Sequence, residues 1–463
     1  MLFEQRLRFR NSKLPVSEAS KRARTGKQRL GERPMAINTA TRAIKKMSYL
    51  RTNVLGRKRE TVEQEVVDEE EVMEIRTSNT ELITETLVER EELINECLEL
   101  YEKAPEKFNH LQKDYHKMFL EYWLNNPLPS GFKSLDASQP WLLYWIGNAF
   151  KTMNPDWLTN DYQKRILDKL WYISPTGGPF SGGKHQLPHL AATYAAINSI
   201  AICHNLDDNR EINKKAIYDW LISLKTPNGA FLTALPIGEQ DVRGVYTALS
   251  VASLLGIVDS KLTNNVTEFL TRCQSYEGGF GGCPNDEAHG GYTFCAVASL
   301  AMLNALDKVN IDALLSWCSS RQTKEEKGLN GRSNKLTDGC YSFWVGGTAA
   351  ILEAYGYGVC IDKDALKQYI LKCCQSEESP GLRDKPGTQA DFYHTNYVLA
   401  GLSICEHSFM ARNNSPFDFV ATPLVSEPDV EPIHPIFGLA ILDVNNFINR
   451  YGELSMSNLS MKV

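Results

Sequence analysis

A glycine-rich turn recurs five times in this chain and constrains its fold more than any other feature. The turns read SPTGGPFSGG (174–183), TPNGAFLTA (226–234), SYEGGFGG (275–282), GLNGRSNKL (328–336) and GLRDKPG (381–387). They are spaced by roughly 50 residues, and self-similarity at such a period is typical of repeat architectures. We therefore expect a fold built from stacked copies of one unit.

Each turn is followed by an apolar segment rich in Ala, Ser and Gly, such as VYTALSVASLLGI or YTFCAVASLAML. These segments are too long and too rich in Ala and Leu for strands, which predicts buried helices. Amphipathic stretches between them, such as DSKLTNNVTEFLTRCQ, predict outer helices. Two helices per repeat indicate stacked hairpins. Because the inner helices look apolar all round, we expect an all-α fold, an α-α barrel (toroid), rather than an open helical solenoid.

The N-terminal part differs in composition from the repeats. Residues 1–59 are rich in Lys and Arg, and residues 60–96 are acidic. Because neither stretch has the apolar content for a core, we expect residues 1–80 to be a disordered or weakly helical extension. The barrel domain is expected over 81–440, followed by a C-terminal tail over 441–463.

Composition narrows the cellular context. No run of about 18 apolar residues occurs, so we expect no transmembrane segment. The net charge of −6 gives no reason to expect nucleic acid as a partner. The 11 cysteines are scattered through apolar segments, which favours reduced thiols in a cytoplasmic protein. The Arg-rich start also suggests a mitochondrial transit peptide, but Glu4, Glu18 and Glu32 argue against one.

The turns should gather the N-termini of the inner helices at one mouth of the ring. Converging helix N-termini create a positive field that suits an anion such as diphosphate. Most of the notable polar side chains follow the turns and should share this mouth. They are His189, Glu239, Asp241, Arg243, Tyr246, His289, Tyr292, Arg332, Lys335, Asp338, Cys340, Tyr341, Asp384, Tyr393 and His394.

Asp338, Cys340 and His394 offer oxygen, sulfur and nitrogen donors from adjacent repeats. Three protein ligands and an open fourth position form the pattern of a catalytic zinc site. By spacing alone the signal is weak, since an Asp-x-Cys with a distant His is more often a matter of packing. The repeat favours zinc, because it predicts that both positions lie at the same mouth.

Four strings in the right order carry a specific resemblance to a known family: DVRGVYTALSVASL, EGGFGG…EAHGGYTFC, GRSNKLTDGCYSFW and DKPGTQADFYHT. Over about residues 95–440 the chain resembles the protein prenyltransferase β subunits, and the farnesyltransferase branch above all. The resemblance implies an α-α barrel in a heterodimer with a helical-repeat α subunit. It also implies transfer of farnesyl from farnesyl diphosphate to the cysteine of a C-terminal CaaX motif, in proteins such as small GTPases. One Zn²⁺ per β subunit, and Mg²⁺, would assist.

The resemblance also assigns roles to individual residues. Zinc would be held by Asp338, Cys340 and His394. The farnesyl diphosphate site would comprise His289, Arg332, Lys335 and Tyr341 on the diphosphate, with Arg243 beside them, and Trp141, Tyr246, Tyr292, Cys295 and Trp344 along the isoprenoid. The peptide site would comprise Trp141, Trp145 and Tyr393 on its aliphatic side chain, and His189, Glu239 and Arg243 near its carboxylate. Tyr341 would also be catalytic, and Asp384 would hold magnesium.

Three alternatives stay open. A geranylgeranyltransferase β subunit would share fold and chemistry, but bulky Trp141 and Tyr246 at the pocket floor favour the shorter lipid, and Asp384 favours the magnesium-assisted type. A terpene cyclase would need an aspartate cluster, and the candidates, Asp207-Asp208 and the acidic run near residue 70, do not lie at the predicted mouth. A non-catalytic helical scaffold or escort protein would leave the predicted zinc ligands unexplained.

Overall fold

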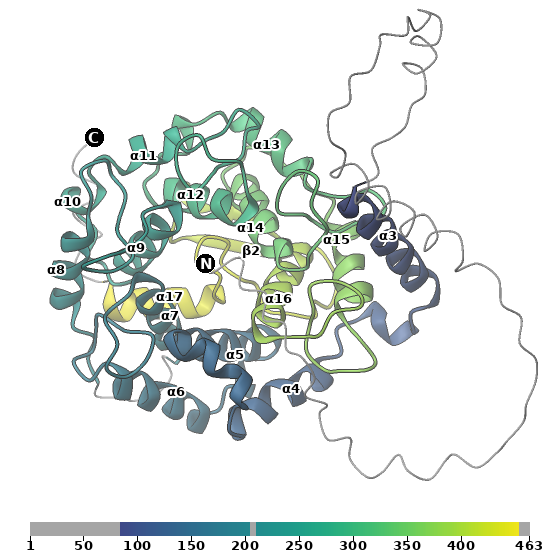
Figure 1. Cartoon of the computed structure of the whole chain (residues 1–463), viewed down its shortest axis with the longest axis horizontal. Coiled ribbons are helices and arrows are strands. Elements are labelled where there is room, and N and C mark those ends of the chain that lie inside the picture. The colour runs from purple at the N-terminus through teal and green to yellow at the C-terminus, as the bar shows by residue number, and fades with distance from the viewer. Residues whose placement is uncertain (1–83, 204–209, 453–463) are drawn as a thin grey trace, which may run out of the picture. The chain divides into compact units, whose positions relative to one another are not determined.

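The computed structural model describes residues 84–203 and 210–452, and over this part the chain forms a closed ring of helical hairpins (Figure 1). The inner helices are α5 (Gln139–Met153), α7 (Leu190–Ala201), α9 (Val242–Leu254), α12 (Gly290–Met302), α14 (Tyr341–Ala354) and α16 (Phe392–Glu406). Each packs against the next, and α16 packs against α5. The predicted all-α barrel is therefore confirmed, and its closure distinguishes it from an open solenoid.

The outer layer consists of amphipathic helices, most of them shorter than the inner ones. They are α6 (Asn160–Ile173), α8 (Lys214–Leu224), α10 (Ser260–Thr263), α11 (Val266–Arg272), α13 (Ile311–Ser319) and α15 (Lys363–Tyr369), the last continuing as a π-helix, η6 (Ile370–Cys374). Short 3-10 turns η4 (Pro155–Trp157) and η5 (Leu306–Lys308) lie in the connections. All twelve residues of α7 are buried, whereas α8 buries only Ile217, Leu221 and Leu224. The inner and outer roles expected from the residue pattern are thus observed.

Elements outside the repeats complete the ring. Before α5 come α3 (Glu85–Lys103), η2 (Glu106–Asn109), α4 (Lys113–Asn125) and η3 (Ser130–Ser138). After α16 come strand β1 (His407–Ala411), η7 (Arg412–Asn414), strand β2 (Phe419–Pro423) and helix α17 (Ile441–Tyr451). The two strands pair antiparallel, with His407 opposite Pro423 and Ala411 opposite Phe419.

In two of the turns a glycine permits close contact with the next outer helix. At Gly229 and Gly278 the backbone has φ of +100° and +103°, a region that side chains disfavour. A Cβ at Gly229 would lie 1.9 Å from the carbonyl oxygen of Asn265, and one at Gly278 would lie 2.1 Å from that of Ala313. At these two turns glycine is required because the turn backbone rests directly on the backbone of the following repeat.

A glutamine at each of three successive turns ties one repeat to the next. Gln274 donates to the carbonyl of Asn310 (2.9 Å) and accepts from its amide (2.9 Å), and Gln322 does the same with Asp362 (2.9 and 2.8 Å). Gln375 accepts from the amide of Gln112 (2.9 Å) and donates to the carbonyl of His110 (3.2 Å). We call each of these glutamines, with its pair of hydrogen bonds, a glutamine clamp. The third clamp joins the last repeat to the N-terminal side of α4 and closes the ring.

The terminal segments expected from the sequence are described only in part. The expected extension, residues 1–80, lies outside the described residues, as does Asp207-Asp208. Residues 441–451 of the expected tail form α17, which packs against α7 and α9. Its Asp443 forms a buried ion pair with Lys151 of α5 at 3.3 Å. None of the described helices is both long and apolar enough to cross a bilayer.

Candidate functional site

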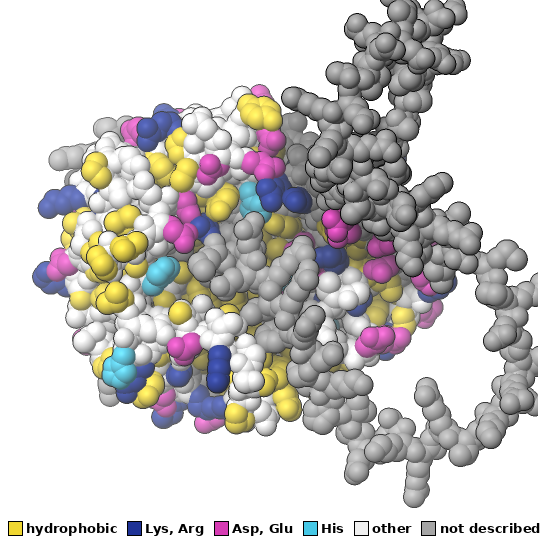
Figure 2. Space-filling model, viewed as in Figure 1, with side chains coloured by type: hydrophobic (Ala, Val, Ile, Leu, Met, Phe, Trp, Pro, Cys, Tyr) yellow, Lys and Arg dark blue, Asp and Glu magenta, His cyan; other side chains and the backbone are white. Residues whose placement is uncertain are grey.

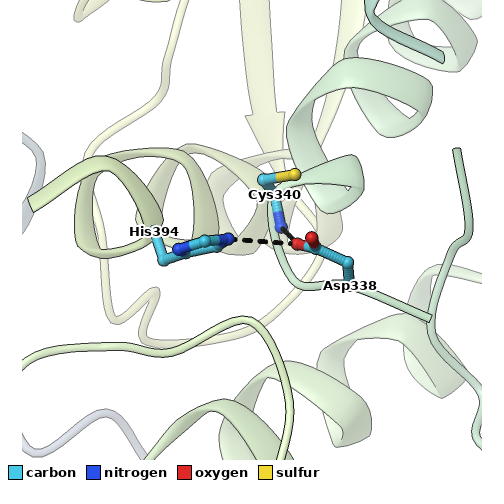
Figure 3. A group of neighbouring side chains, drawn as sticks. All are labelled: Asp338, Cys340 and His394. Atoms are coloured by element: carbon cyan, nitrogen blue, oxygen red, sulfur yellow. Dashed lines mark hydrogen bonds and ion pairs between the residues drawn. The ribbon is translucent and has the colours of Figure 1, made fainter. Parts of the chain in front are cut away.

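Three side chains from two neighbouring repeats converge near the start of α14 (Figure 3). Asp338 and Cys340 lie in the turn that leads into α14, and His394 lies in the first turn of α16. One ligand atom from each lies within 4.8 Å of the other two. His394 Nε2 is 3.3 Å from Asp338 Oδ1, which also accepts from the amide of Cys340 (2.9 Å). The structure therefore brings together the three residues predicted to bind zinc.

The hydrogen bonds around His394 prepare it for a metal. Its Nδ1 lies 2.8 Å from Asp391 Oδ2, and the other oxygen of Asp391 caps the helix by accepting from the His394 amide (2.7 Å). A carboxylate on Nδ1 favours a proton there, which leaves Nε2, buried and 3.3 Å from Asp338 Oδ1, as the nitrogen available to a metal. An oxygen, a sulfur and an imidazole nitrogen fit a zinc ion.

The charges of this group favour a cation. Burial alone would raise the pKa of Asp338, but His394 and the hydrogen bonds from Cys340 hold that pKa well below its ordinary value. Burial would lower the pKa of His394, but Asp391 and Asp338 raise it above its ordinary value. Burial and the nearby Asp338 raise the pKa of the Cys340 thiol. A bound metal ion would supply the positive charge that stabilises the thiolate.

Tyr341 and His289 form the next part of the site, one residue beyond Cys340. Tyr341 Oη lies 3.0 Å from His289 Nε2, and His289 caps α12 by accepting from the Gly291 amide through Nδ1 (3.1 Å). Two glycines make room for the tyrosine ring. A Cβ at Gly290 or Gly331 would lie 2.9 or 2.2 Å from it. These contacts place a phenol and an imidazole side by side at a helix N-terminus.

The basic residues predicted for the diphosphate are held by neighbouring acidic and aromatic side chains or exposed. Arg332 bonds Glu287 at 2.6 Å, and Lys335, in the same loop, is exposed. Arg243 donates to both oxygens of Asp241 (3.1 Å from Nε) and to Glu239 (3.0 Å), and its guanidinium lies 5.3 Å from the centre of the Tyr292 ring.

The peptide-side residues lie on the neighbouring helix starts. His189 caps α7 by accepting from the Ala191 amide (3.1 Å). Burial lowers the pKa of His189, which Glu239 partly offsets, so this imidazole is neutral at pH 7. Because Glu239 also pairs with Arg243, the three predicted residues near the peptide carboxylate form one contiguous group.

The backbone of Asp384 contacts the turn that carries the predicted zinc ligands Asp338 and Cys340. Its carbonyl accepts from the amide of Gly339 at 2.7 Å, between Asp338 and Cys340. Its carboxylate pairs with Lys385 (2.5 Å) and accepts from Thr388. A magnesium ion at this carboxylate would therefore replace Lys385 as its partner.

Aromatic side chains of the inner helices form a closed circuit inside the ring. Successive ring centroids are 4.4–5.6 Å apart, which is within the range of favourable aromatic pairs. In order, the circuit comprises Trp141, Tyr194, Tyr246, Phe294, Trp344, Tyr397, Tyr393 and Trp145. It unites the predicted lipid and peptide residues Trp141, Trp145, Tyr246, Trp344 and Tyr393. Cys295, also predicted there, is buried in α12.

Sequence reasoning missed three members of this circuit: Tyr194, Phe294 and Tyr397. A signal for the first two was present. Tyr194, Tyr246 and Phe294 each lie five residues after the N-cap of their helix, so an alignment of the repeats would have found them.

The segment before α17 contacts the aromatic circuit and the inner helix α5. Tyr246 donates to the carbonyl of Ile436 (2.8 Å), and Tyr194 lies 3.2 Å from Tyr246, hydroxyl to hydroxyl. Asn148 of α5 donates to the carbonyl of Gly438 at 2.9 Å. Tyr246 is thus held against the backbone at Ile436, and its place at a pocket floor stays a prediction.

A cleft of about 740 Å³ lies on the other side of α5. Its wall includes Leu142, Leu143 and Ile146, whereas Trp141 and Trp145 belong to the aromatic circuit. Phe392, which begins α16 two residues before His394, also lines it. The cleft is therefore separate from the circuit but adjoins the element that carries His394.

Comparisons with known proteins show the family to which this fold belongs. The family model of the prenyltransferase alpha-alpha toroid domain matches residues 111–439. Protein farnesyltransferase subunit beta of Saccharomyces cerevisiae is 50% identical over 427 residues, which cover 90% of this chain and 98% of the relative. The Schizosaccharomyces pombe subunit of the same name is 40% identical, covering 77% and 94%.

More distant proteins share the fold. Geranylgeranyl transferase type-1 subunit beta of Arabidopsis thaliana is 35% identical, covering 64% of this chain and 85% of the relative. A solved structure of Candida albicans protein geranylgeranyltransferase-I complexed with GGPP matches with a TM-score of 0.60 at 22% identity, covering 73% of this chain and 98% of that one.

Proposed function

This chain belongs to the prenyltransferase α-α toroid family and, within it, to the protein farnesyltransferase β subunits, and we propose that it is a zinc-dependent catalytic subunit that farnesylates CaaX proteins. The enzyme class, a transferase of prenyl groups, follows from this membership. The convergence of Asp338, Cys340 and His394 is the observation that carries the zinc proposal.

Asp338, Cys340 and His394 would hold the zinc ion. When bound, zinc would lower the pKa of a coordinated substrate thiol, so that the thiol is nucleophilic at neutral pH. Asp391 holds the His394 imidazole in the tautomer that a metal requires. The role of the protein is to fix this geometry before the substrate arrives.

We assign the diphosphate to the group around Tyr341. The Tyr341 hydroxyl can donate to a developing diphosphate oxyanion, and His289 keeps that hydroxyl in position. Arg332 and exposed Lys335 supply positive charge in the loop that also carries Asp338. Since charge builds on the leaving group as its bond to the prenyl carbon breaks, these donors act more strongly in the transition state than in the ground state.

The prenyl chain would lie along the aromatic circuit. The rings of Trp141, Tyr194 and Tyr246 follow one another in tilted pairs with centroids 5.5–5.6 Å apart, and the Tyr246 hydroxyl reaches the backbone at Ile436. This wall of large rings supports farnesyl over the longer geranylgeranyl chain, because a fourth isoprene would need space that the rings occupy.

The partner, the second metal and the location are further proposals. A farnesyltransferase α subunit would complete a heterodimer, and exposed apolar side chains such as Met118 (61% exposed) and Tyr276 (98%) give it surface to cover. Figure 2 shows charges of both signs interspersed with apolar side chains on the described part of the face in view. Asp384 would hold Mg²⁺ near the diphosphate. We propose that the enzyme acts in the cytoplasm.

Substitution of one ligand tests the zinc proposal. Cys340→Ala in the complex with the α subunit should lower bound zinc well below one per complex and abolish farnesyl transfer to a CaaX peptide. Binding of farnesyl diphosphate should largely survive, because other residues form that site. The matched control is Cys405→Ala, a buried thiol near the far end of α16 and outside the ligand set. Full zinc content in Cys340→Ala would disprove the ligand assignment.

A further inference from the structure

A single glycine separates the two proposed zinc ligands that precede α14, Asp338 and Cys340. We call residues 338–340 the metal turn. The separation of the two ligands depends on the backbone dihedrals of Gly339, and glycine has the fewest steric restrictions of any residue. Since a rotation of this peptide would move the ligands relative to each other, Gly339 needs restraint from the structure around it.

The structure restrains Gly339 through a segment of the next repeat. The Gly339 amide donates to the carbonyl of Asp384 at 2.7 Å. A Cβ at Gly339 would lie 2.8 Å from Cγ2 of Val398 and 3.0 Å from the carbonyl oxygen of Arg383. The metal turn therefore lies directly on residues 383–384, and its conformation depends on how firmly those residues are held.

The same carbonyl accepts a second hydrogen bond, from a buried tyrosine. Tyr369 Oη donates to the Asp384 carbonyl at 2.7 Å, and the tyrosine side chain is fully buried. Burial raises the pKa of Tyr369, so the hydroxyl keeps its proton and remains a donor at neutral pH. Because a carbonyl oxygen has two lone pairs, the Gly339 N–H and the Tyr369 O–H together satisfy it. Tyr369 and the metal turn are thus connected through one oxygen atom.

Tyr369 belongs to an element that also holds the neighbouring residue. It is the last residue of α15, directly before the π-helix η6, and a Cβ at Gly328 of the fourth glycine turn would lie 2.8 Å from its ring. Arg383 donates from its amide to the carbonyl of Cys374 (3.1 Å) and from Nε to that of Cys373 (3.0 Å), both in η6. π-helices are rare and frequently lie at functional sites. The end of α15 and η6 therefore support the segment on which the metal turn rests.

We propose that Tyr369 is a positioning residue of the zinc site. Its hydroxyl fixes the Asp384 carbonyl, that carbonyl fixes the Gly339 amide, and Gly339 sets the separation of the two ligands in the metal turn. This role rests on the proposed zinc function and adds to it a residue outside the ligand set. Groups that orient metal ligands change metal affinity when they are replaced, although they do not bind the metal.

The side chain of Asp384 takes part in a different set of contacts. Its carboxylate pairs with Lys385 at 2.5 Å and accepts from Thr388. The carbonyl of Asp384 therefore supports the metal turn, whereas its carboxylate bonds within its own loop. A substitution that changes only the carboxylate should leave the metal turn in place, which separates support by the backbone from an effect of charge.

Tyr369→Phe tests the proposal, because it removes the hydroxyl and keeps the ring. Zinc affinity of the complex with the α subunit is measured by chelator competition, without any prenyl substrate. We expect Tyr369→Phe to weaken zinc affinity about tenfold. Tyr144→Phe is the matched control, since Tyr144 is also fully buried and donates to a backbone carbonyl, that of Gly438 before α17 (3.3 Å). Its zinc affinity should stay within about twofold of wild type.

A second variant tests the route through the backbone. Asp384→Asn leaves the carbonyl in place, so its zinc affinity should also stay within about twofold of wild type. A loss as large as that of Tyr369→Phe would mean that the carboxylate supports the zinc site, and would overturn the proposed route.

A spectroscopic measurement separates positioning from stability. Co²⁺ can replace zinc, and its visible absorption depends on the geometry of its ligands. Tyr369→Phe should change the Co²⁺ spectrum of the complex, and Tyr144→Phe should not. If both variants unfold at lower urea concentration than wild type but keep its zinc affinity and Co²⁺ spectrum, Tyr369 is merely structural and the proposal is overturned. A wild-type complex that binds no zinc would instead overturn the proposed function itself, and this role with it.

Discussion

The closing joint of the ring contains a histidine that must stay neutral, and this makes stability depend on pH. His116 of α4 is fully buried; its Nδ1 accepts from the amide of Gly381 (3.1 Å), and its Nε2 lies 2.9 Å from Gln375 Oε1. Burial lowers the pKa of His116 from 6.5 to about 4. A second proton would have to sit on Nδ1, against the Gly381 N–H. Protonation therefore opposes the hydrogen bonds that close the ring.

Proton linkage gives the sign and the size of the change in unfolding free energy with pH. Between pH 6.5 and about 4 the unfolded chain binds a proton at this position and the folded chain does not, so stability falls as the pH falls. A shift of that size corresponds to ~3 kcal/mol once the pH is below both pKa values, and ~2 kcal/mol is already lost at pH 5. The stabilisation is fully present above pH 6.5.

The assay compares wild type with His116→Gln in the complex with the α subunit. Urea unfolding, followed by tryptophan fluorescence, is measured at fixed protein concentration from pH 7.5 to 4.5. Wild type should be more stable at pH 7.5, because glutamine cannot reproduce both hydrogen bonds. Its advantage should shrink by ~2 kcal/mol at pH 5, since the variant lacks the titrating group. A difference in unfolding free energy that stays constant with pH would refute this reasoning.

Three further outcomes are expected. Asp391→Asn should weaken zinc affinity roughly 10- to 100-fold in a chelator competition, since it disturbs the tautomer of His394; unchanged affinity would contradict that role. Trp141→Thr should raise the specificity constant for geranylgeranyl relative to farnesyl diphosphate by about tenfold, because overfilling a packed site costs ~1–3 kcal/mol; an unchanged ratio in a two-lipid competition would place the floor elsewhere. Asp384→Lys should lose most of the rate increase with magnesium, and an equal response in both proteins would exclude Asp384 as the magnesium site.

The ring could be predicted from the sequence because the glycine turns recur at its period and the Ala-rich segments indicate its inner helices. Closure was inferred from helices apolar on every side, and the contact of α16 with α5 confirms it. The clamp at Gln375 could not be predicted. A glutamine in a polar turn is usually solvated, and its partners near residue 110 are remote in sequence.

The proposed site could be predicted from the sequence less completely than the ring. Cys340 and His394 are separated by a whole repeat, so their spacing alone is a weak signal; the repeat predicted that they share one mouth, and the family resemblance assigned them as ligands. From the sequence alone, Asp391, which orients His394, cannot be distinguished from an ordinary helix cap. Phe294 was missed because a single aromatic in an apolar helix reads as core, and only its register relative to Tyr246 distinguishes it.

The clamp at Gln375 also constrains how the chain is made. It bonds a residue synthesised 263 positions earlier, the amide of Gln112. At ~5–20 residues per second, α4 would wait roughly 10–50 s on the ribosome before its partner emerges. During that interval the apolar surface of α5, which α16 later covers, has no intramolecular cover from the last repeat. Contacts of such long sequence separation slow folding. The nascent chain should therefore need protection at its N-terminal helices until translation has passed the final glycine turn.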